Sequence, residues 1–131
     1  MQTIYKVYMN GDSQIEECLV SENCLTKFLH QHRHCSDLNV IGSNSLFVLR
    51  MESGEIVDCC SNELKTMLER SLQAIQRAET LGTWERLSLY KVSVEVRKVE
   101  TYFIYSTTKE QAERDFLDWC IFPPTDVTQV A

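Results

Sequence analysis

The chain repeats one order of apolar and polar positions three times. Each repeat has an apolar run, a short polar turn, a second apolar run, and then a Ser or Thr that begins a helical pattern. Apolar runs joined by short turns are typical of β-hairpins, and a recurring order indicates repeated units. The pattern therefore predicts three hairpin–helix (ββα) units, which span residues 3–33, 45–82 and 86–122, followed by a tail at 123–131.

The hairpin turns are expected where residues tolerate positive φ. Asn10-Gly11 and Ser53-Gly54 are of this kind, whereas the third turn, near Arg97, has no glycine. The third hairpin has the most regular alternation, since its apolar residues occupy every second position. Alternation with a period of two predicts one covered and one solvated face. The apolar members are Tyr90, Val92, Val94 and Val96.

Helical periodicity follows each hairpin. The first helix is expected from Ser21 to His32 and the second from Ser61 to Leu81, where Gly82 is a natural stop. The third is expected to begin at Thr107, which forms a capping box with Glu110, and to end before Pro123-Pro124. The apolar stripe of the second helix is Leu64, Leu68, Leu72 and Ile75, widened by Met67, Ala74 and Ala78.

These elements predict a single α+β domain over residues 1–131. It would have about six mostly antiparallel strands, with three helices packed as a single layer on the sheet. The stretch 33–44 is expected to be a plain connector and residues 123–131 a loose tail. The length of 131 residues is enough for one ordinary core.

Composition narrows the class of protein. With 44% hydrophobic and 24% charged residues and a net charge of −6, the chain is globular and acidic. The net charge disfavours binding to nucleic-acid phosphate. No apolar run reaches membrane-spanning length, and the N-terminus begins in a strand pattern rather than a signal peptide. We therefore expect a cytoplasmic protein whose six irregularly spaced cysteines are thiols.

One stretch offers metal ligands. His30 and His34 are four residues apart and could share a helix face, with Cys35 beside them. Imidazole and thiolate are ligands that suit zinc. The alternative is a polar helix end, in which the histidines lie near the negative pole of the helix dipole. The alternative is favoured, so no cofactor is predicted.

A catalytic centre is not indicated by any motif. Cys59-Cys60 precedes the expected cap Ser61, where a thiol could be activated, and His30 or His34 could serve as its base. No phosphate-binding, nucleophile-elbow or zinc-protease motif is present. The sequence therefore predicts that the protein is not an enzyme.

Four acids are spread along the third helix: Glu110, Glu113, Asp115 and Asp118. They are expected on its outer face, where they form either a solvated helix surface or a docking surface for a basic partner.

The third unit carries a partial resemblance. Y90-K-V-S-V-E-V, followed by T101-Y-F-I-Y-S-T-T-K-E-Q-A-E-R-D-F, resembles the second half of a double-stranded-RNA-binding domain. In that family a hairpin leads into a helix with a lysine-rich start that grips phosphate. Here the corresponding residues are Thr107, Thr108, Lys109 and Glu110, with one lysine and an acid, so the resemblance implies shared hairpin–helix geometry.

Three functions follow as hypotheses. The first is a small acidic protein that binds another protein with a basic surface, such as a phage- or plasmid-encoded inhibitor of a host nuclease or defence complex (anti-CRISPR or anti-restriction type). The second is a nucleic-acid-binding module that uses the third hairpin–helix. The third is a thiol- or metal-dependent enzyme that uses His30 to Cys35. No membrane partner is expected, and a homo-oligomer is compatible with the sequence.

Overall fold

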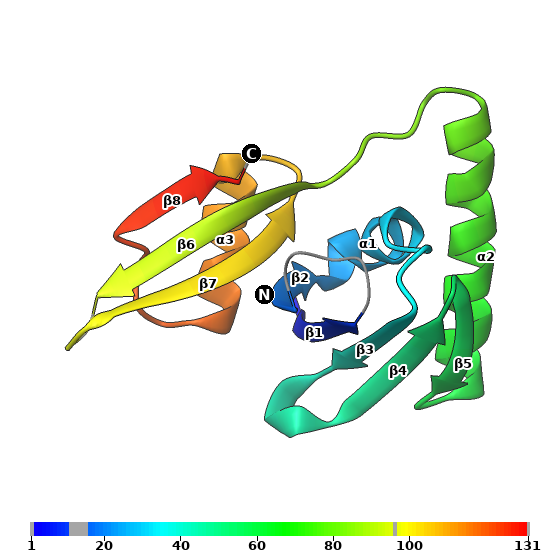
Figure 1. Ribbon diagram of the computed structural model, residues 1–131, viewed down its shortest axis with the longest axis horizontal. Helices are drawn as coiled ribbons and strands as arrows, with labels where there is room; N and C mark the ends of the chain where they lie inside the picture. The colour runs from blue at the N-terminus through cyan, green and yellow to red at the C-terminus, as the bar shows by residue number, and fades with distance from the viewer. Residues whose placement is uncertain (1, 11–15, 96, 131) are drawn as a thin grey trace.

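The computed structural model describes residues 2–10, 16–95 and 97–130 (Figure 1). It has an eight-stranded, mostly antiparallel sheet and three α-helices. The strands are β1 (Ile4–Asn10), β2 (Glu17–Ser21), β3 (Asp37–Ile41), β4 (Phe47–Glu52), β5 (Glu55–Cys59), β6 (Ser88–Glu95), β7 (Val99–Ser106) and β8 (Asp126–Gln129). The helices are α1 (Leu25–Gln31), α2 (Asn62–Thr80) and α3 (Lys109–Trp119), with short 3₁₀ turns η1 (Glu22–Cys24) and η2 (Ser43–Ser45).

The strands lie in the order β5-β4-β3-β1-β2-β7-β6-β8. The N-terminal half of the chain therefore forms one side of the sheet and the C-terminal half the other (Figure 1). The two halves meet where β2 pairs with β7 in parallel, with Leu19 opposite Ile104 and Val20 opposite Tyr105. All other strand pairs are antiparallel.

The helices cover opposite faces of the sheet. Val20 belongs to a core that contains Phe28 of α1, whereas its neighbour Leu19 belongs to a core that contains Phe116 of α3. Adjacent residues of a strand point to opposite faces, so α1 and α3 lie on different sides. The expected single layer of helices is therefore wrong. The parallel pairing of β2 with β7 accounts for the two helical layers. It relates the two halves by a rotation about an axis along the strands, which exchanges the faces of the sheet.

The first core lies between α1 and strands β1 to β5. Phe28 and Leu29 are fully buried, and α2 adds Leu68 at its edge, with Leu64 and Leu72 partly buried beside it. Helix α2 packs chiefly on α1 and β5. Met67 and Ala74 are exposed, so the expected widening of its apolar stripe was wrong at these two positions.

The second core lies between α3 and strands β6, β7 and β8. Phe116 and Ala112 are fully buried against Val92 and Ile104. The expected inward face of the third hairpin is confirmed for Tyr90, Val92 and Val94, while Val96 lies outside the described residues.

Two strands were missed in the sequence, so the expectation of six strands and three ββα units is not matched. β3 lies within the expected connector, where Leu38 and Val40 alternate with polar residues and enter the first core. β8 lies in the expected loose tail and pairs with β6, with only Val127 buried. The α+β class and the three helices are confirmed.

Side-chain and backbone hydrogen bonds cap the ends of α2 and α3. Ser61 caps α2 by accepting a hydrogen bond from the Leu64 amide, and Gly82, with a φ of 76°, follows the end of α2 at Thr80. The amide of Thr83 donates to the carbonyl of Ala78, which closes the last turn. The expected cap Thr107 was one residue early. Thr108 caps α3 and accepts from the Gln111 amide.

The turns agree with the sequence where they are described. Ser53 and Gly54 both have positive φ, 51° and 87°, as the hairpin between β4 and β5 requires. The turn at Asn10-Gly11 extends outside the described residues. Within the described ranges, no helix is long and apolar enough to span a membrane.

Adjacent residues of α3 provide a test of the second core. Phe116→Ala should lower the free energy of unfolding by about 3–5 kcal/mol, because it removes a fully buried ring. Leu117→Ala removes a side chain that is 46% exposed and should cost under about 1 kcal/mol. Urea unfolding of both variants measures the difference. Equal losses would show that this face of α3 is wrongly assigned.

Candidate functional site

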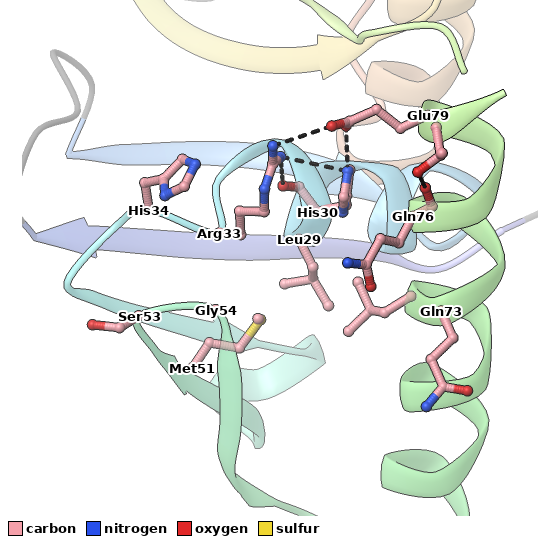
Figure 2. Close-up of a pocket in the computed structure, with 12 residues that line it drawn as sticks. Leu29, His30, Arg33, His34, Met51, Ser53, Gly54, Gln73, Gln76 and Glu79 are labelled. Carbon is pink, nitrogen blue, oxygen red and sulfur yellow. Dashed lines mark hydrogen bonds and ion pairs between the residues drawn. The ribbon is translucent and has the colours of Figure 1, made fainter. Parts of the chain in front are cut away.

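An open cleft of about 470 Å³ lies between α1, α2 and the β4–β5 hairpin (Figure 2). It contains the histidine stretch that the sequence singled out. Its walls include polar side chains from two helices and backbone from the hairpin turn. The lining residues are Leu29, His30, Arg33, His34, Met51, Ser53, Gly54, Leu72, Gln73, Gln76, Glu79 and Thr80.

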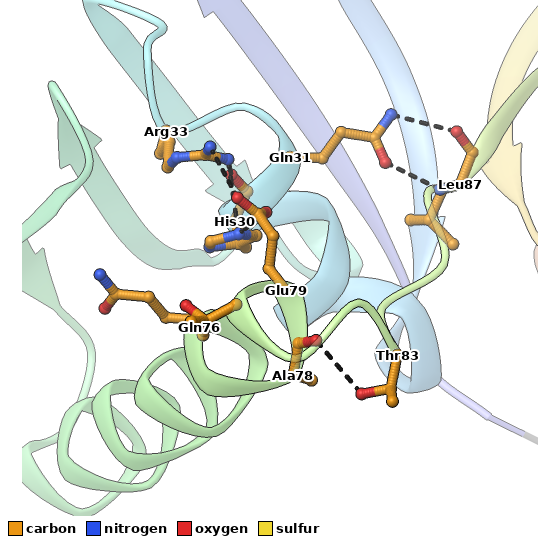
Figure 3. Close-up of polar contacts among 9 residues, drawn as sticks. His30, Gln31, Arg33, Gln76, Ala78, Glu79, Thr83 and Leu87 are labelled. Carbon is orange, nitrogen blue, oxygen red and sulfur yellow. Dashed lines mark hydrogen bonds and ion pairs between the residues drawn. The ribbon is translucent and has the colours of Figure 1, made fainter.

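His30 is buried and engaged at the edge of this cleft. Its Nε2 is 2.5 Å from Oε2 of Glu79 on α2. Arg33 donates from Nη2 to Oε1 of Glu79 at 3.3 Å, and from Nη1 to the carbonyl of His30 at 2.9 Å (Figures 2 and 3). The three side chains therefore fasten the end of α2 to α1.

The segment after α2 is held at the same place. Trp84 packs edge-on against His30, with ring centroids 5.1 Å apart. The Gln31 side chain donates to the carbonyl of Leu87 at 3.0 Å and accepts from its amide at 2.8 Å (Figure 3). This pair of hydrogen bonds fixes the chain where it enters β6. The cluster joins α1, α2 and the entry to the second half.

The electrostatics of the cluster are those of a structural contact. The hydrogen bond with His30 lowers the pKa of Glu79, and Arg33 and Arg86 lower it further by charge. Arg33 is committed to Glu79 and to a backbone carbonyl, and His30 to Glu79. The charged side chains His30, Arg33 and Glu79 of this cleft are thus already paired with one another.

The candidate metal ligands His30, His34 and Cys35 are not arranged around one point. His34 is exposed and lies beyond Arg33 from His30 in Figure 2. The thiol of Cys35 lies 3.0 Å from the carbonyl oxygen of Asn10 and 3.2 Å from that of Asp37. Among the described residues, no group of three or more His, Cys, Asp or Glu side chains is arranged to hold a metal ion.

The cysteines are all unpaired thiols. Cys59 is half-buried against the first core, and Cys60 is exposed before the cap Ser61. Burial raises the pKa of the Cys18 thiol well above its usual range, so Cys18 remains protonated.

The four acids of α3 do not share one face. Glu110 is exposed, and Glu113 and Asp118 are half-buried, but Asp115 is fully buried. The expectation that Asp115 belongs to the outer face is therefore wrong. It is three residues after Ala112 and four before Trp119, so it lies on the inward side of the helix.

Asp115 is the centre of a hydrogen-bond network. Its Oδ1 accepts from the side-chain amides of Gln2 at 2.5 Å and Gln111 at 2.7 Å, and its Oδ2 accepts from Ser106 Oγ at 3.1 Å. Three donors compensate the burial of this carboxylate. The network joins the N-terminus, the end of β7 and α3, so it fixes α3 on the sheet.

Apolar side chains are exposed on α3 and just after its end. Leu117 is 46% exposed, Trp119 36%, Ile121 88% and Phe122 44%. We call these four residues, with Glu110, Glu113 and Asp118, the α3 patch. Sequence reasoning found its acids but missed its apolar residues. The available signal was that W119-C-I-F is an apolar run at the end of the expected helix, directly before Pro123.

Comparisons of the chain with protein-family models, with curated proteins and with solved structures found no match.

The buried carboxylate gives a prediction about stability. Asp115→Ala should lower the free energy of unfolding by about 1–3 kcal/mol, because it leaves the donors of Gln2, Gln111 and Ser106 without their acceptor. Glu110→Ala, on the exposed side of the same helix, should cost under about 0.5 kcal/mol. Thermal and urea unfolding measure both. A larger loss for Glu110→Ala would contradict the described network.

A second prediction concerns pH. His32 stacks on Phe28 at 4.2 Å and meets Tyr105 edge-on at 4.9 Å. Burial lowers the pKa of His32 below its ordinary value. The unfolded chain therefore binds this proton at a higher pH than the folded chain, and stability falls as pH drops below about 6.5.

His32→Phe keeps a stacked ring and removes this titration. The free energy of unfolding of the variant, relative to that of the wild type, should increase when the pH is lowered from 7.5 to 5.5. Urea unfolding at both pH values measures this change. His34→Asn removes an exposed histidine and is the control. A stability difference between His32→Phe and wild type that does not change with pH would contradict the stated burial.

Proposed function

We propose that this protein acts by binding another protein through the α3 patch. The observation that supports this most is the gathering of exposed apolar residues at the end of α3. Leu117, Trp119, Ile121 and Phe122 fall within six consecutive residues. Exposed apolar clusters with polar rims are typical of interaction sites, and aromatic residues contribute most to their affinity.

The acids of the patch favour a basic partner. Glu110, Glu113 and Asp118 border the apolar residues, and the whole chain has a net charge of −6. Such charges accelerate association with a partner of opposite sign and oppose binding to nucleic acid. Lys109 is the one lysine at the start of α3, and Glu110 follows it directly.

The contacts of His30 and Cys35 favour a binding function over a catalytic one. His30 is paired with Glu79 and is buried, while the thiol of Cys35 approaches backbone carbonyls. In its most specific form, the proposal is an inhibitor that covers the basic surface of a nuclease or a defence complex. The acids of the patch would then meet cations that otherwise contact phosphate.

Charge reversal tests the proposal once a pull-down has supplied the partner. Glu110→Lys with Glu113→Lys should slow association by about tenfold at low salt, and by less at high salt, because charge steering is then screened. Surface plasmon resonance measures these rates.

The control is Glu63→Lys with Glu69→Lys on α2, which changes the net charge equally. Glu63 has the same place in the first turn of α2 as Glu110 has in α3. The control should leave most of the association rate intact. If both double variants slow association equally, the slowing depends on net charge alone, and the proposed patch is wrong.

A further inference from the structure

A second cleft borders the α3 patch and has a different composition from the first. It has a volume of about 580 Å³ and lies between the end of α3, strand β1 and the loop between β3 and β4. Trp119 and Asp118 line it from α3, and Tyr8 and Lys6 from β1. The other lining residues are Gln2, Thr3, Ile4, Ile41, Gly42, Ser43, Asn44 and Ser45.

The fold places these residues together in a defined way. Lys6 pairs with Ile41 across β1 and β3, and also with Leu19, which lies beneath α3. These side chains therefore share the face that α3 covers in part. The Asp115 network then fixes the end of α3 beside β1, since it joins α3 to Gln2 next to the start of that strand.

The loop wall of the cleft has an unusual backbone. Asn44 and Ser45 have consecutive positive φ angles of 58° and 60°. Non-glycine residues in this region carry strain and occur often at binding sites. Both residues line the cleft together with Trp119 and Asp118.

The cleft is lined by one acid, Asp118, and one base, Lys6. The Nζ of Lys6 is 2.7 Å from Oε1 of Glu17 and 5.9 Å from the centre of the Tyr8 ring, so Glu17 and Tyr8 already engage this cation. Within residues 2–10, 16–95 and 97–130, no cationic side chain forms an ion pair with Asp118. The Asp118 carboxylate and the neighbouring Trp119 ring, which is 36% exposed, therefore remain available to a bound molecule.

We propose that this cleft binds an arginine side chain of the partner protein. A guanidinium group donates hydrogen bonds in a planar fork that suits a carboxylate such as Asp118, and it stacks on aromatic rings such as Trp119. The inference rests on the proposed function, because it names the partner chemistry that the α3 patch recognises.

The test uses N-acetyl-arginine methylamide as the probe, added to the full chain and followed by NMR. Saturable shifts are expected at the indole N–H of Trp119 and the side-chain amide of Asn44. N-acetyl-citrulline methylamide has the same shape without the charge, and it should bind at least about tenfold more weakly. Equal shifts with citrulline, or shifts that do not saturate, would overturn the proposal. N-acetyl-lysine methylamide is the third probe. If it binds as tightly as the arginine derivative, the assignment to arginine is wrong.

Variants at one position identify the carboxylate. Asp118→Asn should weaken binding of the arginine derivative by about tenfold, whereas Asp118→Glu should retain most of it. Asp126→Asn removes an acid on β8 outside the cleft and should leave binding unchanged. An Asp118→Asn variant that binds as wild type would overturn the proposal.

The two proposals fail separately. If Glu110→Lys with Glu113→Lys slows the partner while the arginine derivative does not bind, the arginine cleft is wrong and the patch stands. If the arginine derivative binds but the charge reversal leaves the association rate of the partner unchanged, the patch is wrong.

Discussion

The parallel pairing of β2 with β7 is the constraint on which the rest of the structure depends. Only two residue pairs form it, yet it decides which side of the sheet each half covers. Leu19 and Val20 are adjacent, and they enter two different cores. Because of this junction α3 lies on the side away from α1 and α2. The face of β1 and β3 beside α3 is then left open, and it becomes the floor of the second cleft.

The buried carboxylate of Asp115 fixes α3 on its face of the sheet. It joins residues 113 positions apart in the chain, Gln2 and Asp115, and also holds Ser106 at the end of β7. With α3 held on its inward side, the side chains of Leu117, Ile121 and Phe122 remain exposed. The His30–Glu79 contact has the corresponding task in the other half, where it holds α2 on α1. Asp115 and His30, which the sequence offered as candidate site residues, thus each hold a helix in place.

Much of the fold could be predicted from the sequence because it rests on local signals. The helical stretches, the Ser53-Gly54 turn and the stop at Gly82 follow from periodicity and from positive φ. β3 and β8 were missed because each is short and gains its stability from neighbours far away in the chain. The layer arrangement could not be predicted, since no local pattern specifies a parallel junction between Leu19 and Ile104. Asp115 was misplaced because charge alone suggested exposure, although its spacing from Ala112 and Trp119 indicated the inward side.

The central claim is that the α3 patch is the surface that a partner protein covers. Hydrogen–deuterium exchange of the chain, alone and with a partner captured by pull-down, tests it most directly. The account predicts new protection at residues 117–122 and at the loop 42–46, with α2 unchanged. Protection confined to the cleft between α1 and α2, with residues 117–122 exchanging as in the isolated chain, would contradict it.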